Sequence, residues 1–174
     1  MGDFGEKLLL LIAGATLGAL IQQYRSAVSE ELNLINDHIK DFEKFCDLSV
    51  KYWTESFSDF HSNETLAARV MAAHYSCFHL FSHMCVFCGD NAGEYQRLSH
   101  ELNMAATGGN FNSKEHRPDP HRVADIVSIH SELVHQLRMA RPHVISLRRA
   151  VGKLSTKCQR ACNNFMRPNR PWLT

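Results

Sequence analysis

The stretch LLLLIAGATLGALIQQY, residues 8–24, contains no charged side chain over 17 consecutive positions. As an α-helix, it would be roughly 25 Å long, slightly less than the ~30 Å hydrocarbon core of a bilayer. With help from its flanking residues, such a helix can span a membrane. A short apolar run is also compatible with a buried helix in an oligomeric core. We favour the membrane interpretation.

The residues around this stretch indicate an uncleaved anchor rather than a secretory signal. A signal peptide begins with a basic region and ends at a small-residue cleavage site. Here Asp3 and Glu6 accompany Lys7, and a helical pattern continues through Arg25 without interruption. Because Lys7 and Arg25 flank the stretch almost symmetrically, they specify orientation only weakly, and the basic C-terminal region favours a cytoplasmic C-terminus.

Small residues within the stretch predict that two such helices can pack closely. Gly14 and Gly18 form a small-xxx-small pattern, reinforced by Ala15 and Ala19. This pattern lets helix backbones approach each other in lipid. We therefore predict contact with membrane lipid and homo-oligomerisation through Gly14 and Gly18. The residues assigned to membrane contact and oligomerisation are Leu8, Leu11, Gly14, Leu17, Gly18 and Ile21.

The rest of the chain also has helical periodicity. Apolar positions recur at helical spacing over residues 26–60, with Tyr52 and Trp53 expected in a core. Residues 94–106 form an amphipathic stretch that ends at Thr107-Gly108-Gly109, and Asp119-Pro120 should start the next helix. Pro142 should break that helix, and a last helix should cover about residues 143–163.

Residues 64–88 are the most apolar part of the body, and we expect one helix with Ser62 or Asn63 as its N-cap. It is apolar nearly all round, which predicts a buried central helix. The alternative is a second membrane segment, in which Arg69 and three histidines would each need a partner in hydrocarbon.

Together these patterns predict an all-α protein, a small helical bundle with a projecting N-terminal apolar helix. Length favours one ordinary domain with an appendage. We divide the chain into an N-terminal membrane-seeking helix, residues 1–25, a bundle body, residues 26–141, and a basic C-terminal helix and tail, residues 142–174. No strand-like alternation, phosphate-binding glycine loop or internal repeat appears.

Charge is distributed unevenly along the chain. Residues 1–132 carry 10 Lys and Arg and all 18 Asp and Glu, whereas residues 133–174 carry 9 Lys and Arg and no acid. A basic face can track the phosphates of nucleic acid or lipid, or dock on a protein partner. A solvated face, or pairing with the chain's own acidic stretch, explains the charges about equally well. The residues assigned to nucleic-acid or partner binding are Arg148, Arg149, Lys153, Lys157 and Arg160.

No constellation of catalytic or metal-binding residues stands out. Cys85 and Cys88 have the spacing of half a zinc site, but the one other available pair, Cys158 and Cys162, lies on a different predicted helix. The 11 histidines are scattered and none is paired with a nucleophile. We therefore predict reduced cysteines, no metal, no cofactor and no enzymatic activity.

Two blocks of sequence resemble a known group of proteins. They are GATLGALIQQYRSAVSEELNLINDHIKDFEKFCDLSVKYW, residues 14–53, and AATGGNFNSKEHRPDPHRVADIVSIHSELVHQLRMAR, residues 105–141. Their order resembles small bacterial membrane-anchored proteins, some of which look like the membrane-type effectors encoded beside retron reverse transcriptases in anti-phage defence. Those effectors often have two membrane segments, and the second one here would be residues 66–88.

The resemblance implies a toxin-like effector. It would be kept silent in a complex with a reverse transcriptase and its RNA–DNA hybrid, cytoplasmic while complexed and at the inner membrane when active. The alternative is a single-pass membrane scaffold or assembly protein without toxicity.

Overall fold

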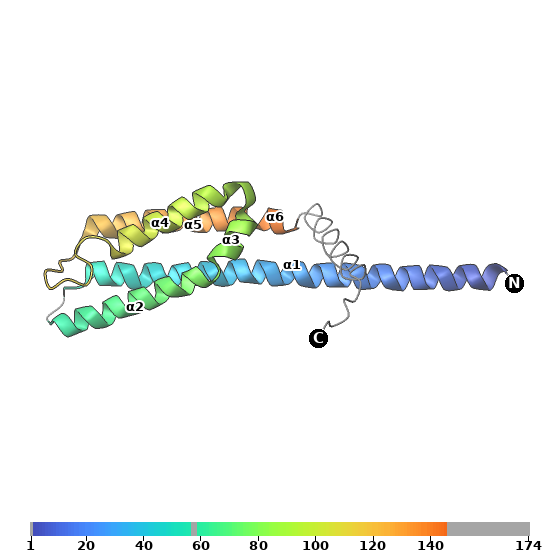
Figure 1. Ribbon diagram of the computed structural model, residues 1–174, viewed down its shortest axis with the longest axis horizontal. Coiled ribbons are helices and arrows are strands. Elements are labelled where there is room, and N and C mark those ends of the chain that lie inside the picture. The colour runs from blue at the N-terminus through green and yellow to red at the C-terminus, as the bar shows by residue number, and fades with distance from the viewer. Residues whose placement is uncertain (1, 57–58, 146–174) are drawn as a thin grey trace, which may run out of the picture.

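The computed structural model describes residues 2–56 and 59–145, and all regular secondary structure within them is helical. This confirms the predicted all-α class. Within the described residues there are four long helices, and three short elements join or extend them (Figure 1). The elements are α1 (Gly2–Thr54), α2 (Phe60–His79), α3 (Phe81–Cys88), the 3-10 helix η1 (Gly89–Asn91), α4 (Ala92–Thr107), α5 (Pro120–Met139) and α6 (Arg141–Ile145).

Helix α1 runs the length of the molecule without a break and carries both the projecting segment and the first wall of the core (Figure 1). Its 53 residues correspond to roughly 80 Å of helix. The apolar positions predicted between residues 35 and 53 are buried, as are Tyr52 and Trp53, which confirms the amphipathic pattern. The buried residues of α1 are Ile35, His38, Ile39, Phe42, Phe45, Cys46, Ser49, Tyr52 and Trp53.

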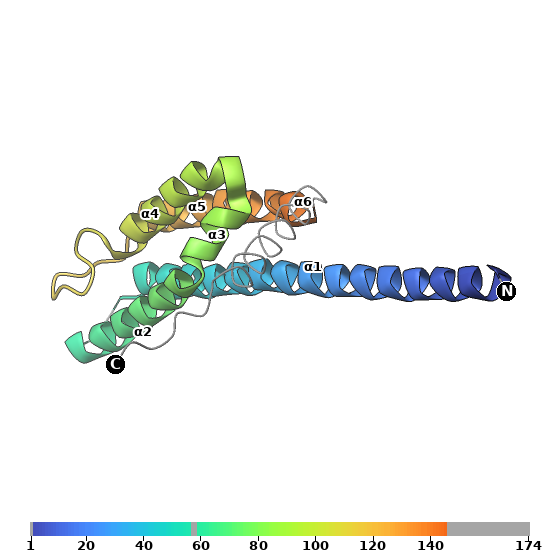
Figure 2. The same ribbon diagram turned by 45° about the vertical axis from the view of Figure 1, so that its right-hand side comes forward.

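The other helices pack against the second half of α1. Figures 1 and 2 show α2 along one side of α1, with α4 and α5 together on the other side. Helix α3 crosses between these two sides. A single apolar cluster connects α1 with α2, α3, α4, α5 and α6. The bundle therefore occupies one end of α1, and the N-terminal half projects beyond it.

The prediction of one helix over residues 64–88 is wrong in three respects. The helix starts earlier, because Asp59 is the N-cap and its carboxylate accepts hydrogen bonds from the Ser62 amide at 2.7 Å and the Ser62 hydroxyl at 3.0 Å. It also breaks at Leu80, where α2 gives way to α3. Finally, it is not buried all round, since Tyr75 is 63% exposed and Phe78 56% exposed. Burial follows one face, which is typical of a helix on the surface of a bundle.

The connection between α4 and α5 follows the prediction. Helix α4 ends at Thr107, and Asp119 caps α5 by accepting a hydrogen bond from the Arg122 amide at 3.1 Å. The Arg122 guanidinium closes the end of α4 by donating to the carbonyls of Ala105 and Gly108 at 3.1 and 2.8 Å. One arginine thus stabilises both ends of this connection, because it satisfies carbonyls that have no partner within α4.

Helix α5 stops at Met139 and α6 begins at Arg141, so the break lies at Ala140, two residues before Pro142, and the proline lies in the first turn of α6. Val144 in α6 is buried in the common core. The packed part of the chain therefore extends past residue 141, where the sequence placed the boundary of the body. Most of the predicted last helix, residues 143–163, lies outside the described residues.

Candidate membrane-binding segment

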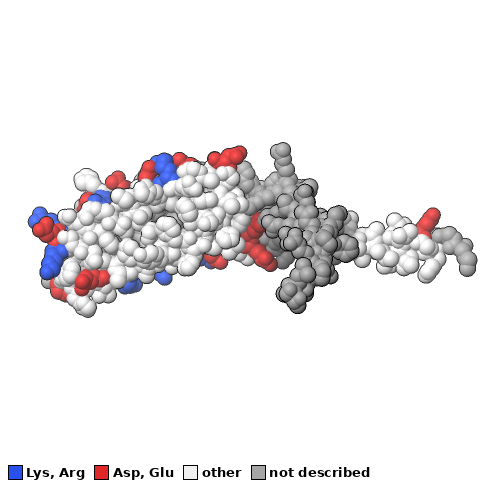
Figure 3. Space-filling model, viewed as in Figure 1, with Lys and Arg blue, Asp and Glu red and all other residues white. Residues whose placement is uncertain are grey.

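Residues 4–23 form the half of α1 that projects from the bundle, and every side chain in this range is exposed. Leu8, Leu11, Leu17 and Ile21 are between 49% and 70% exposed. The part of this segment that is visible in Figure 3 is uncharged apart from an acidic group near the N-terminal tip, whereas acidic and basic groups are spread over the bundle. A contiguous apolar surface of this kind is typical of a membrane or protein contact.

Length and composition make α1 a candidate membrane span. Among the described residues it is the one helix that is long and apolar enough to cross a bilayer, with an 18-residue window of mean hydropathy 1.7 and no buried share. The sequence left open a second membrane segment at residues 66–88. The corresponding helices, α2 and α3, are interrupted at Leu80 and do not meet the same criterion.

The backbone and side chains of the segment suit an apolar environment. Helical hydrogen bonds satisfy the amides and carbonyls within the segment itself, as a membrane span requires. The hydroxyl of Thr16 donates to the carbonyls of Ile12 and Ala13 at 3.0 and 2.9 Å. No charged side chain occurs between Lys7 and Arg25, so the segment can enter hydrocarbon without burying a charge.

Gly14 and Gly18 lie one turn apart on the exposed helix. A Cβ atom at either position would meet nothing within 4 Å, so neither glycine serves packing among the described residues. Leu11 lies three residues before Gly14, and Ile21 lies three residues after Gly18, so both lie on the same face of the helix as the glycines. The structure therefore places the predicted small-residue face where a second helix can reach it.

The end of the apolar segment is tied to the end of α6. The hydroxyl of Tyr24 donates to the Ile145 carbonyl at 2.6 Å, and the Arg141 guanidinium donates to the Asn36 side-chain carbonyl at 2.6 Å. The end of α6 is therefore linked to α1 at Tyr24, directly after the apolar segment. Sequence periodicity could not find this link, because it joins residues 121 positions apart.

The predicted basic face cannot be placed in this geometry. Its members, Arg148, Arg149, Lys153, Lys157 and Arg160, lie outside the described residues, as do Cys158 and Cys162.

The described cysteines are free and mostly buried. Burial raises the pKa of Cys46 to about 11, of Cys77 to about 12 and of Cys88 to about 11, since the interior disfavours a thiolate. Within residues 2–56 and 59–145, no three His, Cys, Asp or Glu side chains are grouped so as to hold a metal ion. The described thiols thus act as small apolar core groups.

Comparisons of the chain with protein-family models, with curated proteins and with solved structures found no match.

Proposed function

We propose that this protein is a membrane-binding effector that inserts the N-terminal half of α1 into a bilayer. The observation that carries the proposal is the exposed, uncharged surface of residues 8–24 on a helix that continues into a closed bundle. Exposing this much apolar surface to water is unfavourable by roughly 25 cal/mol per Å². Insertion into lipid, or cover by a partner, removes that unfavourable exposure.

The resemblance to retron effectors supplies the biological setting of the proposal. In that setting a reverse transcriptase with its RNA–DNA hybrid covers the segment and keeps the protein cytoplasmic. Loss of the complex releases the segment to the bacterial inner membrane. The acid-free basic region after residue 132 supports this setting, because phosphate contacts favour Lys and Arg.

Self-association through Gly14 and Gly18 would turn an anchor into a membrane-damaging assembly. Both glycines are exposed and neither is needed for packing among the described residues. Close approach of two helices at such a face is a recognised mode of association in lipid. The proposed injury is therefore loss of membrane potential rather than an enzymatic reaction.

The test is expression of the full-length protein in bacteria with a potential-sensitive dye. Expression alone should depolarise the cells, and G14I with G18I should reduce this effect because larger side chains separate the helices. The matched control is L9I with L20I, which changes two leucines on the opposite face by the helical spacing. Intact potential at high expression, with and without the partner, would refute the effector proposal.

A second candidate is a single-pass scaffold that anchors partners at the membrane without toxicity. It is favoured by the separation between the projecting segment and the core, because no residue of 4–23 is buried. Replacement of residues 8–24 by an unrelated membrane helix decides between the two. The scaffold keeps its function after this exchange, whereas the effector loses it.

A further inference from the structure

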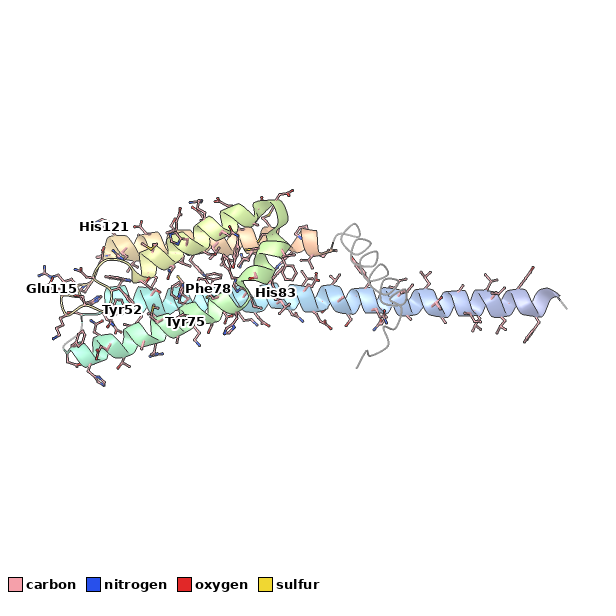
Figure 4. All side chains as sticks on the ribbon, viewed as in Figure 1. Tyr52, Tyr75, Phe78, His83, Glu115 and His121 are labelled. Atoms are coloured by element: carbon pink, nitrogen blue, oxygen red, sulfur yellow. The ribbon has the colours of Figure 1, made fainter. Side chains whose placement is uncertain are left out.

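A cavity of about 240 Å³, partly open to solvent, lies between α1, α2, α3 and α4, and the exposed side chains of Phe78 and Gln96 contribute to its lining. Its aromatic wall is formed by Phe42 and Phe45 of α1, Phe78 of α2 and Phe81 of α3. Figure 4 labels Phe78 near the end of α2, close to the crossing helix α3. Gln96, Ser99 and Asn103 of α4 add a polar rim.

One side chain of the cavity wall has unmade hydrogen bonds. Both ring nitrogens of His74 are buried and have no hydrogen-bond partner among the residues that the structure describes. The ring packs between aromatic neighbours, 5.4 Å from the Phe45 ring and 4.8 Å from the Phe78 ring, measured between centroids. Buried polar groups are nearly always hydrogen-bonded, so this imidazole beside the cavity has donor and acceptor capacity for a molecule bound there.

The lining defines the chemistry of such a molecule. The described lining contains two histidines, His74 and His100, but no Lys, Arg, Asp or Glu, so a charged ligand would find no permanently charged partner there. Aromatic walls favour a flat ring through edge-to-face and offset contacts. A cavity of roughly 150 Å³ can hold benzene, so this one has room for two fused rings.

We propose that this cavity binds a small, neutral, planar aromatic molecule that carries one hydrogen-bonding group for the imidazole of His74. The ligand ring stacks against the phenylalanines, and its polar group meets a ring nitrogen after rotation of the imidazole about χ2, which is a broad torsion. This proposal does not depend on membrane insertion.

The experiment uses the full chain in lipid nanodiscs and two probes of one shape. Indole has an N–H donor, and indene has the same bicyclic outline without it. Calorimetric titration should show saturable binding of indole, with indene weaker by about fivefold, the factor expected for one neutral hydrogen bond. Uptake by the lipid is not saturable and is measured with empty nanodiscs.

Two variants and a control locate the binding. H74F keeps an aromatic ring and removes the nitrogens, so it should bind indole and indene equally. S99F fills the cavity from α4 and should abolish binding of both probes. S128F is the matched control, because Ser128 is exposed on α5 and does not line the cavity.

If a variant fails to fold, nuclear magnetic resonance of the imidazole nitrogens tests the proposal on the unaltered protein. Indole should shift the His74 nitrogen signals of the unaltered protein and leave those of the exposed His121 unchanged. Absence of saturable binding, equal binding to S99F, or unshifted His74 signals at saturation would each overturn the proposal.

Discussion

At the residue scale, the interior of the bundle contains an imidazole that must remain neutral. His38 is completely buried, and its Nε2 lies 2.8 Å from the hydroxyl of Tyr95. Burial lowers the pKa of His38 from 6.5 to about 4, because the interior disfavours the imidazolium ion. Burial also lowers the pKa of His74 and of His130. The folded state therefore resists protonation at several positions in one core.

This predicts that the protein loses stability in mild acid. The unfolded chain takes up protons at its histidines near pH 6.5, whereas folded His38 takes one up only near pH 4. The contribution of His38 is thus fully present above pH 6.5 and is lost progressively down to pH 4, by about 3 kcal/mol. Denaturant unfolding at pH values from 7.5 to 4 measures the loss.

The variant H38Q separates this histidine from the others. Glutamine keeps a hydrogen-bonding group near Tyr95 but does not titrate, so the acid-dependent loss of stability should be smaller than in the unaltered protein. H121Q, at an exposed position of α5, is the control and should leave the pH dependence unchanged. If the unfolding free energy of H38Q falls with pH as steeply as that of the unaltered protein, His38 is not the source of the acid-dependent loss.

Arg122 is the second residue whose contacts predict a measurable effect. It donates to two carbonyls at the end of α4, and its guanidinium carbon lies 4.3 Å from the centroid of the Trp53 ring. R122M keeps the length of the side chain but removes these interactions, so unfolding should become easier by ~2 kcal/mol. Thermal and denaturant melts compare it with R138M, which alters an exposed arginine of the same helix. A similar small change in both variants would contradict the capping role.

At the element scale, a glycine joint lets the chain turn from α3 into α4. Gly89 has a φ of +55°, in a region that disfavours side chains, and it lies between α3 and α4 in the short helix η1. Gly93 lies four residues further on, inside α4, with no neighbour that a Cβ would meet and no positive φ. The backbone at position 89 therefore favours glycine, whereas the backbone at position 93 accepts any good helix former.

We expect G89A to lower the free energy of unfolding by ~1–2 kcal/mol, because alanine is strained at positive φ. G93A should instead raise it by up to about 1 kcal/mol, since alanine is the better helix former. Denaturant unfolding of both variants under one condition measures the contrast. If both changes have the same sign, the joint is not held by the backbone conformation of Gly89.

At the scale of the whole molecule, the bundle and the projecting segment use different parts of one helix. The buried residues of α1 start at Ile35, whereas residues 4–23 are exposed throughout. Tyr24 bonds to the far end of the described chain, through the Ile145 carbonyl. The stability of the bundle and the affinity for a membrane should therefore be separable.

Deletion of residues 2–22 is expected to leave the unfolding free energy of the bundle within ~0.5 kcal/mol of its original value, because residues 4–22 contribute no buried side chain to the described core. The same deletion should abolish flotation with lipid vesicles. Circular dichroism melts and a vesicle flotation assay measure the two properties on the same sample. Loss of the folded bundle would show that the segment packs within the molecule, and continued flotation would place membrane binding elsewhere.

Local signals in the sequence determined several features that the structure bears out. The helical class, the continuous helix through residue 24 and the turn chemistry at Asp119-Pro120 depend on neighbours within a few positions. Hydropathy likewise marks residues 8–24 as the candidate membrane span, because it depends on composition and not on packing. Such features are readable because short-range hydrogen bonds and periodicity fix them.

Only the tertiary structure decided which faces meet. The break at Leu80 brings α3 across the bundle. Residues 64–88 contain no glycine or proline, so the sequence does not predict this break, and we attribute it to packing in the core. The His38–Tyr95 pair and the Tyr24–Ile145 link join positions 57 and 121 residues apart. The cavity beside His74 is lined by residues from four helices. These features depend on how helices pack in space. Sequence periodicity describes only residues that are close along the chain, so it does not predict contacts between distant helices.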